Sequence, residues 1–577
     1  MRGVNQTLHL NIPQSAALIS ADTMAAVGSG GGIYFYWLNL PSWQPPLDPS
    51  WNENPFNNSS WKLFYHSLGW LNTYAALYQH TNDTKYLMLI DNYLDDYDRT
   101  IDNPHESSIS GAYQEDAVSL RVSHLLRLYL LLYASHANEE KEVIERLLDK
   151  DIEMLLVYLE QLKWDDKNHG LIQARAALNI AAAMPLHDKA EMLQEFANRR
   201  ITAASELLFS ESGYVVEQAT EYHFVSLSMM LEINSQLRSF NMPENGALKR
   251  KIEKALIIAP YLLYPDGTMP AIGDSSYGKN WSGYLKRFYQ EYQQLIPELE
   301  DYFALGEQSL EKLMILHDEG LMIAKTLLSG EELSKVFFDV GKSPIVHGHY
   351  DNLNVVAMLN GQKLLVDSGG PFTYEKDNRE LFWQNSAHNL IIVNGEEKPD
   401  SDAEIVSTTS LEKQIEMVGK ILLRGKLMHS RSVILSTEKT SAIVVVDSVS
   451  SVVKGDKTEQ YWHYSPEIRV NPMEDGSVEL STEKGELFYQ YQLHDMVTEC
   501  HVLKGEVDSN GQPKYGWVTP SYNRVIEAPI LKCEAKTNDY FVVNIFSSTP
   551  LTLPFFIRNN VSTEVHLGNG QIIYSSL

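Results

Sequence analysis

The sequence predicts a multidomain chain of the α+β class, in which a helical domain is followed by a domain of antiparallel strands. The 577 residues are too many for one hydrophobic core. From about residue 59 to 320, apolar residues recur at helical spacing. After about 330, short β-branched and aromatic runs alternate with Asn-Gly and Asp-Gly turns. We therefore expect an irregular arm over 1–55, helices over 56–325 and strands over 330–577.

The predicted arm contains a glycine run at 28–32 and four prolines between 41 and 49, which prevent regular structure. It also contains Trp37, Trp43 and Trp51. Because an aromatic ring carries a large apolar surface, these residues either pin the arm to the body or stack on sugar rings.

The helical region begins with a predicted N-cap at Ser60, and Phe64, Leu68, Leu71 and Ala75 then share one helical face. Short polar links predict antiparallel neighbours, and the absence of heptads favours helix pairs wound into a toroid or solenoid. The further helices are expected near 83–100, 112–135, 138–162, 169–184, 187–208, 218–238, 246–262 and 281–297.

The second domain is predicted as a sandwich of many antiparallel strands. Its clearest strand-like runs are 335–340, 442–446, 488–492 and 540–546. The interruption at Ser329-Gly330 marks the expected boundary.

The composition excludes several classes of function. A formal net charge of −28 argues against nucleic-acid binding and against docking on anionic membranes, and it disfavours a densely sulfated partner. No apolar run of about 18 residues is present, so we expect no membrane span. The first residues do not read as a signal peptide. We expect a cytoplasmic protein, or a periplasmic or secreted one if a leader was removed.

Two cysteines, Cys500 and Cys533, exclude a disulfide framework and show no metal or redox spacing. A reducing compartment fits this number, and so does a secreted bacterial protein with few cysteines. A homo-oligomer is compatible with the sequence.

The segment 345–399 carries the densest chemistry. His347, His349 and Asp351 alternate, which in an extended segment places them on one face. The strand at 355–359 runs into Asn360-Gly361, a type I′ turn signal, and the return strand ends at Asp367. His388 precedes a third apolar run at 390–393. Short connections thus predict a catalytic or metal site near one sheet.

The chain has helices first, strands second and histidines where the two regions meet. In this order of features it resembles the heparinase II/III-like polysaccharide lyases. The residues that carry the resemblance are the runs KNHG at 167–170, EQATEYH at 217–223, DGTMPAIGD at 266–274, HGH at 347–349 with Asp367, and AHN at 387–389. The resemblance implies an incomplete α/α toroid followed by an antiparallel β-sandwich, with the active site in the cleft between them. One departure is Ala219, where these lyases usually have serine.

Such lyases cleave next to a uronic acid by β-elimination, which needs a neutralised carboxylate, a base for the C5 proton and an acid for the leaving oxygen. By resemblance, Asn168 and His169 bind the carboxylate, although Asn168 also fits a helix cap. Tyr222 is the implied base and returns the proton. Because a phenol has a pKa near 10, we expect a nearby His or Arg to lower it.

His347 is expected to complete the carboxylate clamp or to act as the acid. The resemblance implies a divalent metal, usually zinc, bound by His349, Asp367 and His388, which holds His347 in place. The alternative for these three is an ordinary hydrogen-bonded cluster without metal.

Further candidates are weaker. Four residues are candidates for substrate binding: Glu217 and His223, which are also expected to support the site, and Tyr374 and Arg379, which are expected to face the substrate. Arg379 fits a sulfate or carboxylate contact, or a surface salt bridge. Arg121 is a weaker substrate contact still. Asp351 either orients an imidazole or marks a turn, and the loop 266–274 is expected to be structural.

Two other functions compete with a lyase acting on an acidic, glycosaminoglycan-like polysaccharide or oligosaccharide. A toroidal glycoside hydrolase needs two carboxylates that flank the bond, and acidic residues are abundant here. A carbohydrate-binding protein without activity is the other alternative.

Overall fold

The computed structural model describes residues 32–101, 109, 111–134, 139–160, 167–292, 302, 306–328, 332–342, 346–371, 373–374, 376–399, 401–423, 427–438, 441–450, 456–494, 498–536, 540–559 and 562–577. The chain forms two compact units. The first comprises Met1–Phe209 and Val225–Glu253, and the second comprises Ser210–Phe224 and Lys254–Leu577. We describe each unit by itself.

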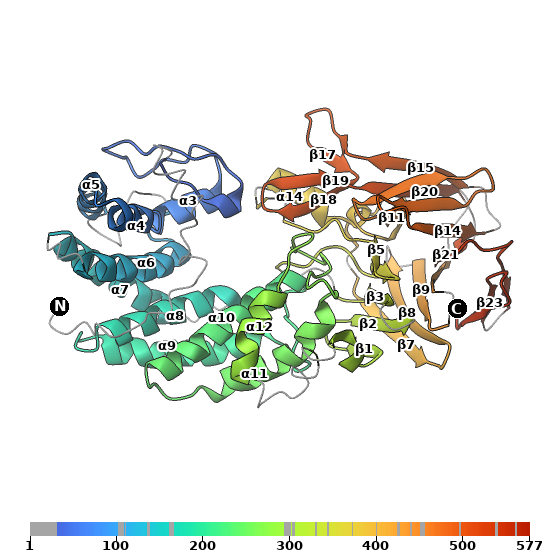
Figure 1. The fold of residues 1–577 in the computed structure, drawn as a ribbon, viewed down its shortest axis with the longest axis horizontal. Coiled ribbons are helices and arrows are strands. Elements are labelled where there is room, and N and C mark those ends of the chain that lie inside the picture. Colours follow the sequence, from blue (N-terminus) through green and yellow to red (C-terminus); the bar gives the residue numbers. More distant parts are fainter. Residues whose placement is uncertain are drawn as a thin grey trace. The chain divides into compact units, whose positions relative to one another are not determined.

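The first unit is helical, as predicted (blue to green in Figure 1). Neighbours in the chain pack on one another, such as α4 with α5 and α8 with α9, and α6 also contacts α3, α4, α7 and α8. The helices are α3 (Ser59–His66), α4 (Leu71–Thr81), α5 (Lys85–Thr100), α6 (Glu115–Ala134), α7 (Glu139–Glu160), α8 (Lys167–Ala183), α9 (Ala190–Leu208), α10 (Thr220–Ser239) and α11 (Gly246–Ile258), the last two being shared with the second unit.

The start of the helical unit differs from its prediction in two ways. The cap of α3 is Asn58, whose side chain accepts a hydrogen bond from the Trp61 N–H at 2.8 Å, and not Ser60. The single helical face predicted through Leu68 is divided between α3 and α4, because Leu68 takes a left-handed backbone conformation with φ of 55°. The helical spacing of apolar residues continues from α3 into α4, so the spacing alone does not show that the helix is interrupted at Leu68.

The tryptophans of the arm pack on this unit. Trp51 is fully buried and its ring stacks on Tyr65 at 5.3 Å, while its indole N–H donates to Asp96 at 2.9 Å. Trp43 meets Trp61 edge-on at 5.4 Å. Trp37 is 38% exposed and also meets an aromatic ring of α3. These contacts favour the pinning role. Residues 1–31 lie outside the described chain.

The second unit is built from antiparallel strands, as predicted, with the helices α12 (Ser282–Tyr292) and α14 (Lys376–Trp383). Its five-stranded sheet contains β1 (Leu313–Leu316), β2 (Leu321–Leu328), β3 (Glu332–Asp339), β4 (Val355–Leu359) and β5 (Gln362–Leu365) in that order. Its eight-stranded sheet has the order β12 (Ile468–Pro472), β13 (Val478–Thr482), β14 (Leu487–Leu493), β21 (Tyr540–Ser547), β10 (Ala442–Ser450), β9 (Leu427–Ser436), β8 (Gln414–Leu423) and β7 (Ala403–Ser410).

A four-stranded sheet contains β15 (Thr498–Lys504), β20 (Pro529–Lys536), β11 (Lys457–His463) and β6 (Ile391–Val393). These three sheets share one buried core, to which β3, β9 and β11 contribute Phe338, Val433 and Trp462. Smaller pairs and a three-stranded sheet complete the unit: β16 (Glu506–Val507) with β17 (Pro513–Tyr515), β18 (Trp517–Ser521) with β19 (Arg524–Glu527), and β22 (Phe555–Arg558), β23 (Thr563–His566) and β24 (Ile572–Ser575).

The predicted turn at Asn360-Gly361 joins β4 and β5, and both residues have the positive φ that a type I′ turn requires. The strands of this segment belong to two sheets, because β4 and β5 lie in the five-stranded sheet and β6 pairs with β11 in the four-stranded sheet. The prediction that His347, His349 and Asp351 lie along a strand is wrong, because these residues precede β4 in a loop.

Cys500 and Cys533 form a disulfide between directly opposed positions of β15 and β20. The two residues are 33 positions apart, and two isolated cysteines gave no pairing signal.

None of the helices in the described ranges is both long and apolar enough to cross a bilayer.

Candidate active site and metal centre

Tyr222 lies in the first turn of α10, which is held by the loop that follows η3 (Ala259–Leu262). The Thr220 N–H donates to the Ile272 carbonyl at 3.1 Å, and the Glu221 N–H donates to Ser275 Oγ at 2.9 Å. Early N–H groups of a helix have no partner within it, so this loop satisfies two of them. Tyr222 is thereby fixed in the second unit, with the strands, and not with the bulk of the helices.

Tyr222 contacts Tyr374 and His347, two residues whose side chains can accept and donate protons. Its hydroxyl lies 2.6 Å from the Tyr374 hydroxyl, and its ring stacks on His347 with 3.5 Å between ring centres. Burial, with Tyr374 and Asp274 nearby, raises the pKa of Tyr222 well above 10. Burial likewise raises the pKa of Tyr374. The expectation of a lowered Tyr222 pKa is therefore wrong, and both phenols are protonated at neutral pH.

Asp274 is the centre of the hydrogen bonding at this site. Its Oδ2 lies 2.8 Å from His347 Nδ1 and 2.8 Å from Arg379 Nη2, and its Oδ1 lies 3.1 Å from His349 Nε2. Burial would raise the pKa of this carboxyl, but the hydrogen bonds from both histidines and the Arg379 charge hold it well below its usual range. Asp274 is therefore ionised, although its side chain is only 1% exposed.

The sequence placed Asp274 in a structural loop with no chemical role. Its signal was weak, because a Gly-Asp pair after apolar residues is common in turns. Gly273 explains the close approach: at φ of 64°, a Cβ there would come within 2.6 Å of the Gln218 carbonyl and 2.8 Å of the His347 carbonyl. Glycine thus lets the loop pass between the start of α10 and the histidine segment.

Arg379, on α14, has a second bond to the Val346 carbonyl at 3.0 Å. Its guanidinium lies over the rings of Tyr374 and Trp383, at 5.4 and 5.6 Å from their centres. The Arg379 side chain is 27% exposed, whereas the Asp274 side chain is only 1% exposed. This placement suits the predicted anion contact as well as an ion pair.

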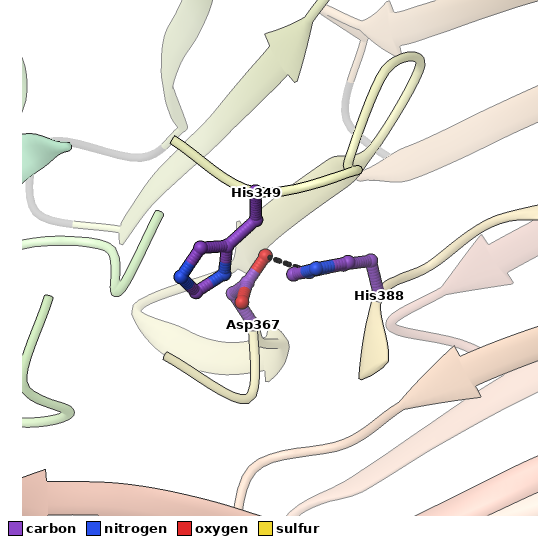
Figure 2. Close-up of side chains that lie close together, drawn as sticks. All are labelled: His349, Asp367 and His388. Carbon is purple, nitrogen blue, oxygen red and sulfur yellow. Dashed lines mark hydrogen bonds and ion pairs between the residues drawn. The ribbon is translucent and has the colours of Figure 1, made fainter. Parts of the chain in front are cut away.

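The predicted metal ligands are brought together. His349, Asp367 and His388 are buried, and each offers one ligand atom within 4.8 Å of the others. Figure 2 shows them converging, with His388 Nδ1 bonded to Asp367 Oδ2 at 2.9 Å. They come from loops, not from strands: His349 precedes β4, Asp367 follows β5, and His388 follows η5 (Asn385–Ala387).

The donor set fits a divalent cation. His349 Nδ1 and His388 Nε2 are buried and have no hydrogen-bond partner within the described part of the chain. Buried polar atoms are rarely left unpaired, and two imidazoles with a carboxylate are suitable ligands of zinc. Burial lowers the pKa of His349, which keeps it neutral. Burial alone would raise the pKa of Asp367. The charge and hydrogen bond of His388 outweigh this effect and lower the pKa below its usual value, so Asp367 is ionised.

Asp351 does not join this group. It is 5% exposed and lines a cavity of about 10 Å³ together with Tyr214, Glu319 and Asp339. Burial, then the charges of Asp339 and Asp367, raise its pKa well above the usual value. It orients neither His347 nor His349 by a hydrogen bond.

Glu217 and His223 are buried beside the start of α10. His223 Nε2 lies 3.1 Å from the Ala255 carbonyl, and burial lowers the pKa of this imidazole to about 3, so it is a neutral donor. With 1% and 0% exposure, both residues are placed to support Tyr222 and not to touch a substrate directly.

Asn168 and His169 lie in the first turn of α8, in the first unit. Asn168 is partly buried and lies inside the helix instead of before it, which does not favour the capping role. His169 is 44% exposed, and its Nδ1 lies 3.0 Å from Asp116 Oδ2 and 3.6 Å from Glu115 Oε1. Sequence reasoning missed these two carboxylates beside His169.

Arg121 lies in the core of the first unit. Its side chain is fully buried and pairs with Asp151 through Nε at 2.9 Å and through Nη2. Its Nη1 donates to Tyr97 and to the carbonyls of His66 and Ala112. A substrate has no access to this guanidinium, so the structure does not support the predicted contact.

Comparison with family models matches residues 6–303 to the heparinase II/III N-terminus and residues 316–529 to the heparinase II/III-like C-terminal domain. A crystal structure of heparinase III has a TM-score of 0.81 at 15% identity, over 100% of this chain and 93% of that chain. A mutant heparan sulfate lyase from Pedobacter heparinus has a TM-score of 0.69 at 16% identity, over 96% and 88%.

Another heparinase III, with methylated lysines, has a TM-score of 0.71 at 18% identity, over 97% of this chain and 91% of that chain. At these identities the likeness concerns the fold. Comparison with curated proteins finds no match.

Proposed function

The chain belongs to the heparinase II/III-like family, and we propose that it is a polysaccharide lyase that cleaves a uronic-acid-containing chain by β-elimination. The observation that carries this proposal is the cluster of Tyr222, Tyr374 and His347 beside the Asp274 carboxylate. Two hydroxyls at 2.6 Å and one oriented imidazole provide groups that accept and donate protons within one site.

The reaction breaks the C5–H bond of the uronate and passes that proton to Tyr222 in its phenolate form. The C4–C5 double bond forms from the electron pair, and the C4–O4 bond breaks. The departing oxygen takes a proton from Tyr222 or Tyr374, so no water is consumed. The products are an unsaturated uronate end and a new hydroxyl end.

The phenolate is the costly species in this scheme. The pKa of Tyr222 is raised in the absence of substrate, so fewer than about one in 1,000 molecules carries the phenolate at pH 7. The Tyr374 hydroxyl is the group within hydrogen-bond distance that can donate to a Tyr222 phenolate once it forms. A small population of a strong base suits a weakly acidic C5 proton.

We propose that His349, Asp367 and His388 hold zinc. When bound, the ion would supply a rigid anchor for the loop that carries His349 and, two residues earlier, His347. Its role here is structural, and no step of the elimination passes through it.

The uronate carboxylate must be neutralised as charge develops on it. Arg379 is our candidate for this contact in the second unit, because its side chain is 27% exposed and its guanidinium lies over the Tyr374 ring. Asn168 and His169 remain predicted carboxylate ligands. The net charge of −28 favours a sparsely charged glycosaminoglycan-like substrate or an oligosaccharide over a densely sulfated chain.

The test is a panel of heparan sulfate, hyaluronate, chondroitin, alginate and bacterial exopolysaccharides, followed by ultraviolet absorbance of the unsaturated uronate. We expect an absorbance gain with at least one polymer, and a larger gain with a weakly charged member of the panel than with a densely sulfated one. New reducing ends without absorbance would indicate a hydrolase. Binding without either signal would indicate a carbohydrate-binding protein.

A further inference from the structure

The Asp274 carboxylate joins the two histidines that the proposed function uses in different ways. Its Oδ2 meets Nδ1 of His347, the imidazole stacked on Tyr222. Its Oδ1 meets Nε2 of His349, one of the three residues of the metal centre. One side chain, 1% exposed, therefore touches both the reactive cluster and the metal cluster.

The backbone around Asp274 fixes this carboxylate in place. The Asp274 N–H donates to the His347 carbonyl at 2.8 Å, so the residue is tied to the histidine segment by main chain and side chain. On the opposite side, Gly370 approaches closely: a Cβ there would lie 3.2 Å from Asp274 Oδ1 and 3.0 Å from His349 Cε1. The carboxylate thus has little room to rotate away from either ring.

The hydrogen bonds also decide which nitrogen of each ring carries hydrogen. A guanidinium only donates hydrogen bonds, and the two carboxylate oxygens of Asp274 accept them. His347 must therefore carry its hydrogen on Nδ1, which leaves Nε2 as the other ring nitrogen for the reaction. His349 must carry its hydrogen on Nε2, which leaves a lone pair on Nδ1, the buried atom without a partner in the described chain.

We propose that Asp274 is a positioning residue that sets the tautomers of His347 and His349 together, and so couples metal binding to the orientation of the reactive imidazole. This inference rests on the proposed function for its catalytic half. Metal-bound histidines commonly donate their second ring N–H to a carboxylate, which orients the ring and strengthens binding. Here the same carboxylate also orients a second, non-ligating histidine.

The main experiment replaces the carboxylate by its amide in the full-length protein, as Asp274→Asn. The amide can accept through one oxygen only, so one histidine loses its acceptor. We expect zinc affinity, measured by competition with a chromophoric chelator, to fall about 10- to 100-fold. We expect kcat at saturating zinc to fall by a similar factor, with KM nearly unchanged, because the Asp274 side chain is only 1% exposed.

The matched control is Asp266→Asn in the same loop. Asp266 is exposed and bonds to Lys363 and Thr268, away from both histidines. Zinc affinity and kcat should both stay at the wild-type level. Circular dichroism and the thermal midpoint of each variant report whether the fold is retained.

A second measurement does not depend on the variant folding. Nitrogen NMR of the wild-type protein with labelled histidine should show hydrogen on Nδ1 of His347 and on Nε2 of His349. The opposite tautomers would overturn the inference. So would unchanged zinc affinity in Asp274→Asn, or a loss of zinc affinity with kcat per zinc-loaded molecule unchanged.

The two failures are distinguishable. A wild-type protein that forms no unsaturated product from any polymer ends the proposed lyase function. The chelator competition and the tautomer measurement still decide whether Asp274 organises both histidines.

Discussion

The two units each contain a buried carboxylate that meets an arginine. Comparing the two shows how a network that only stabilises the fold differs from one that can take part in a reaction. In the helical unit, Asp151 and Arg121 satisfy each other, and neither side chain is more than 1% exposed. In the second unit, Asp274 meets Arg379 and two histidines, and this network still has polar groups that are exposed or without a hydrogen-bond partner. Arg379 is 27% exposed, and His349 Nδ1 is buried without a partner in the described chain.

A buried charge alone therefore does not mark a functional site. A closed network such as that of Arg121 fixes the packing of helices, because every N–H it offers on Nη1 has a protein acceptor. An open network with unpaired or exposed polar atoms can take a further ligand. The following predictions test this distinction, beginning with the largest expected effect.

Tyr222→Phe removes one hydroxyl from the open network. We expect kcat to fall by roughly 10²–10⁴, the range for loss of a general acid–base group, with substrate affinity and thermal midpoint retained. Product absorbance and calorimetric binding measure the two effects. Tyr574→Phe, on an exposed strand, is the control and should leave kcat unchanged. Full activity of Tyr222→Phe would remove Tyr222 from the reaction.

Arg121→Met breaks the closed network and leaves Asp151 buried without its cation. We expect the helical unit to lose about 3–5 kcal/mol of unfolding free energy, measured by urea denaturation. The activity of each folded molecule should not change. Arg121→Met with Asp151→Leu should recover most of the loss, because an apolar pair replaces both charges. A fall in kcat with unchanged stability would instead place Arg121 in the reaction.

The proposed zinc should stabilise the second unit only, so that its removal destabilises that unit. At free zinc 100 times above Kd, an ion bound there would contribute about 2.7 kcal/mol to the folded state. Chelation should therefore raise hydrogen exchange around His349, Asp367 and His388 and leave α4 to α7 unchanged. A chelated protein with unaltered exchange at these loops would contradict the metal centre.

The pH dependence of kcat/KM separates Tyr222 from His347 as the base. The pKa of Tyr222 is raised in the folded protein, so its basic form is scarce at pH 7 and grows as pH rises toward that pKa. We expect kcat/KM to rise about tenfold per pH unit from neutral to alkaline pH. A kcat/KM that is already constant between neutral and alkaline pH would exclude Tyr222 as the base.

Much of the site could be predicted from residues that lie close together in sequence motifs. His349, Asp367 and His388 were expected as a group, and they are within ligand distance of one another. Periodicity located most helices and strands, because it reflects local burial. Asp351 was misplaced, because alternation shows a shared face only if the segment is a strand, and this segment is a loop.

Features that depend on distant packing could not be predicted. Asp274 acquires its role from residues 73, 75 and 105 positions away in the chain, and nothing local distinguishes it from a turn residue. The Cys500–Cys533 bond depends on the register of β15 and β20. Arg121 resembled a site residue, because a sequence does not show that an arginine in a helix has a buried partner.

The most direct test of the account is the mass of the products released from a uronic-acid oligosaccharide of defined length. Elimination consumes no water, so the two product masses should sum to the substrate mass, and the product with the unsaturated uronate should absorb ultraviolet light. Tyr222→Phe should release the same two products roughly 10²–10⁴ times more slowly. Products whose masses sum to the substrate plus one water would contradict the account and make the protein a hydrolase.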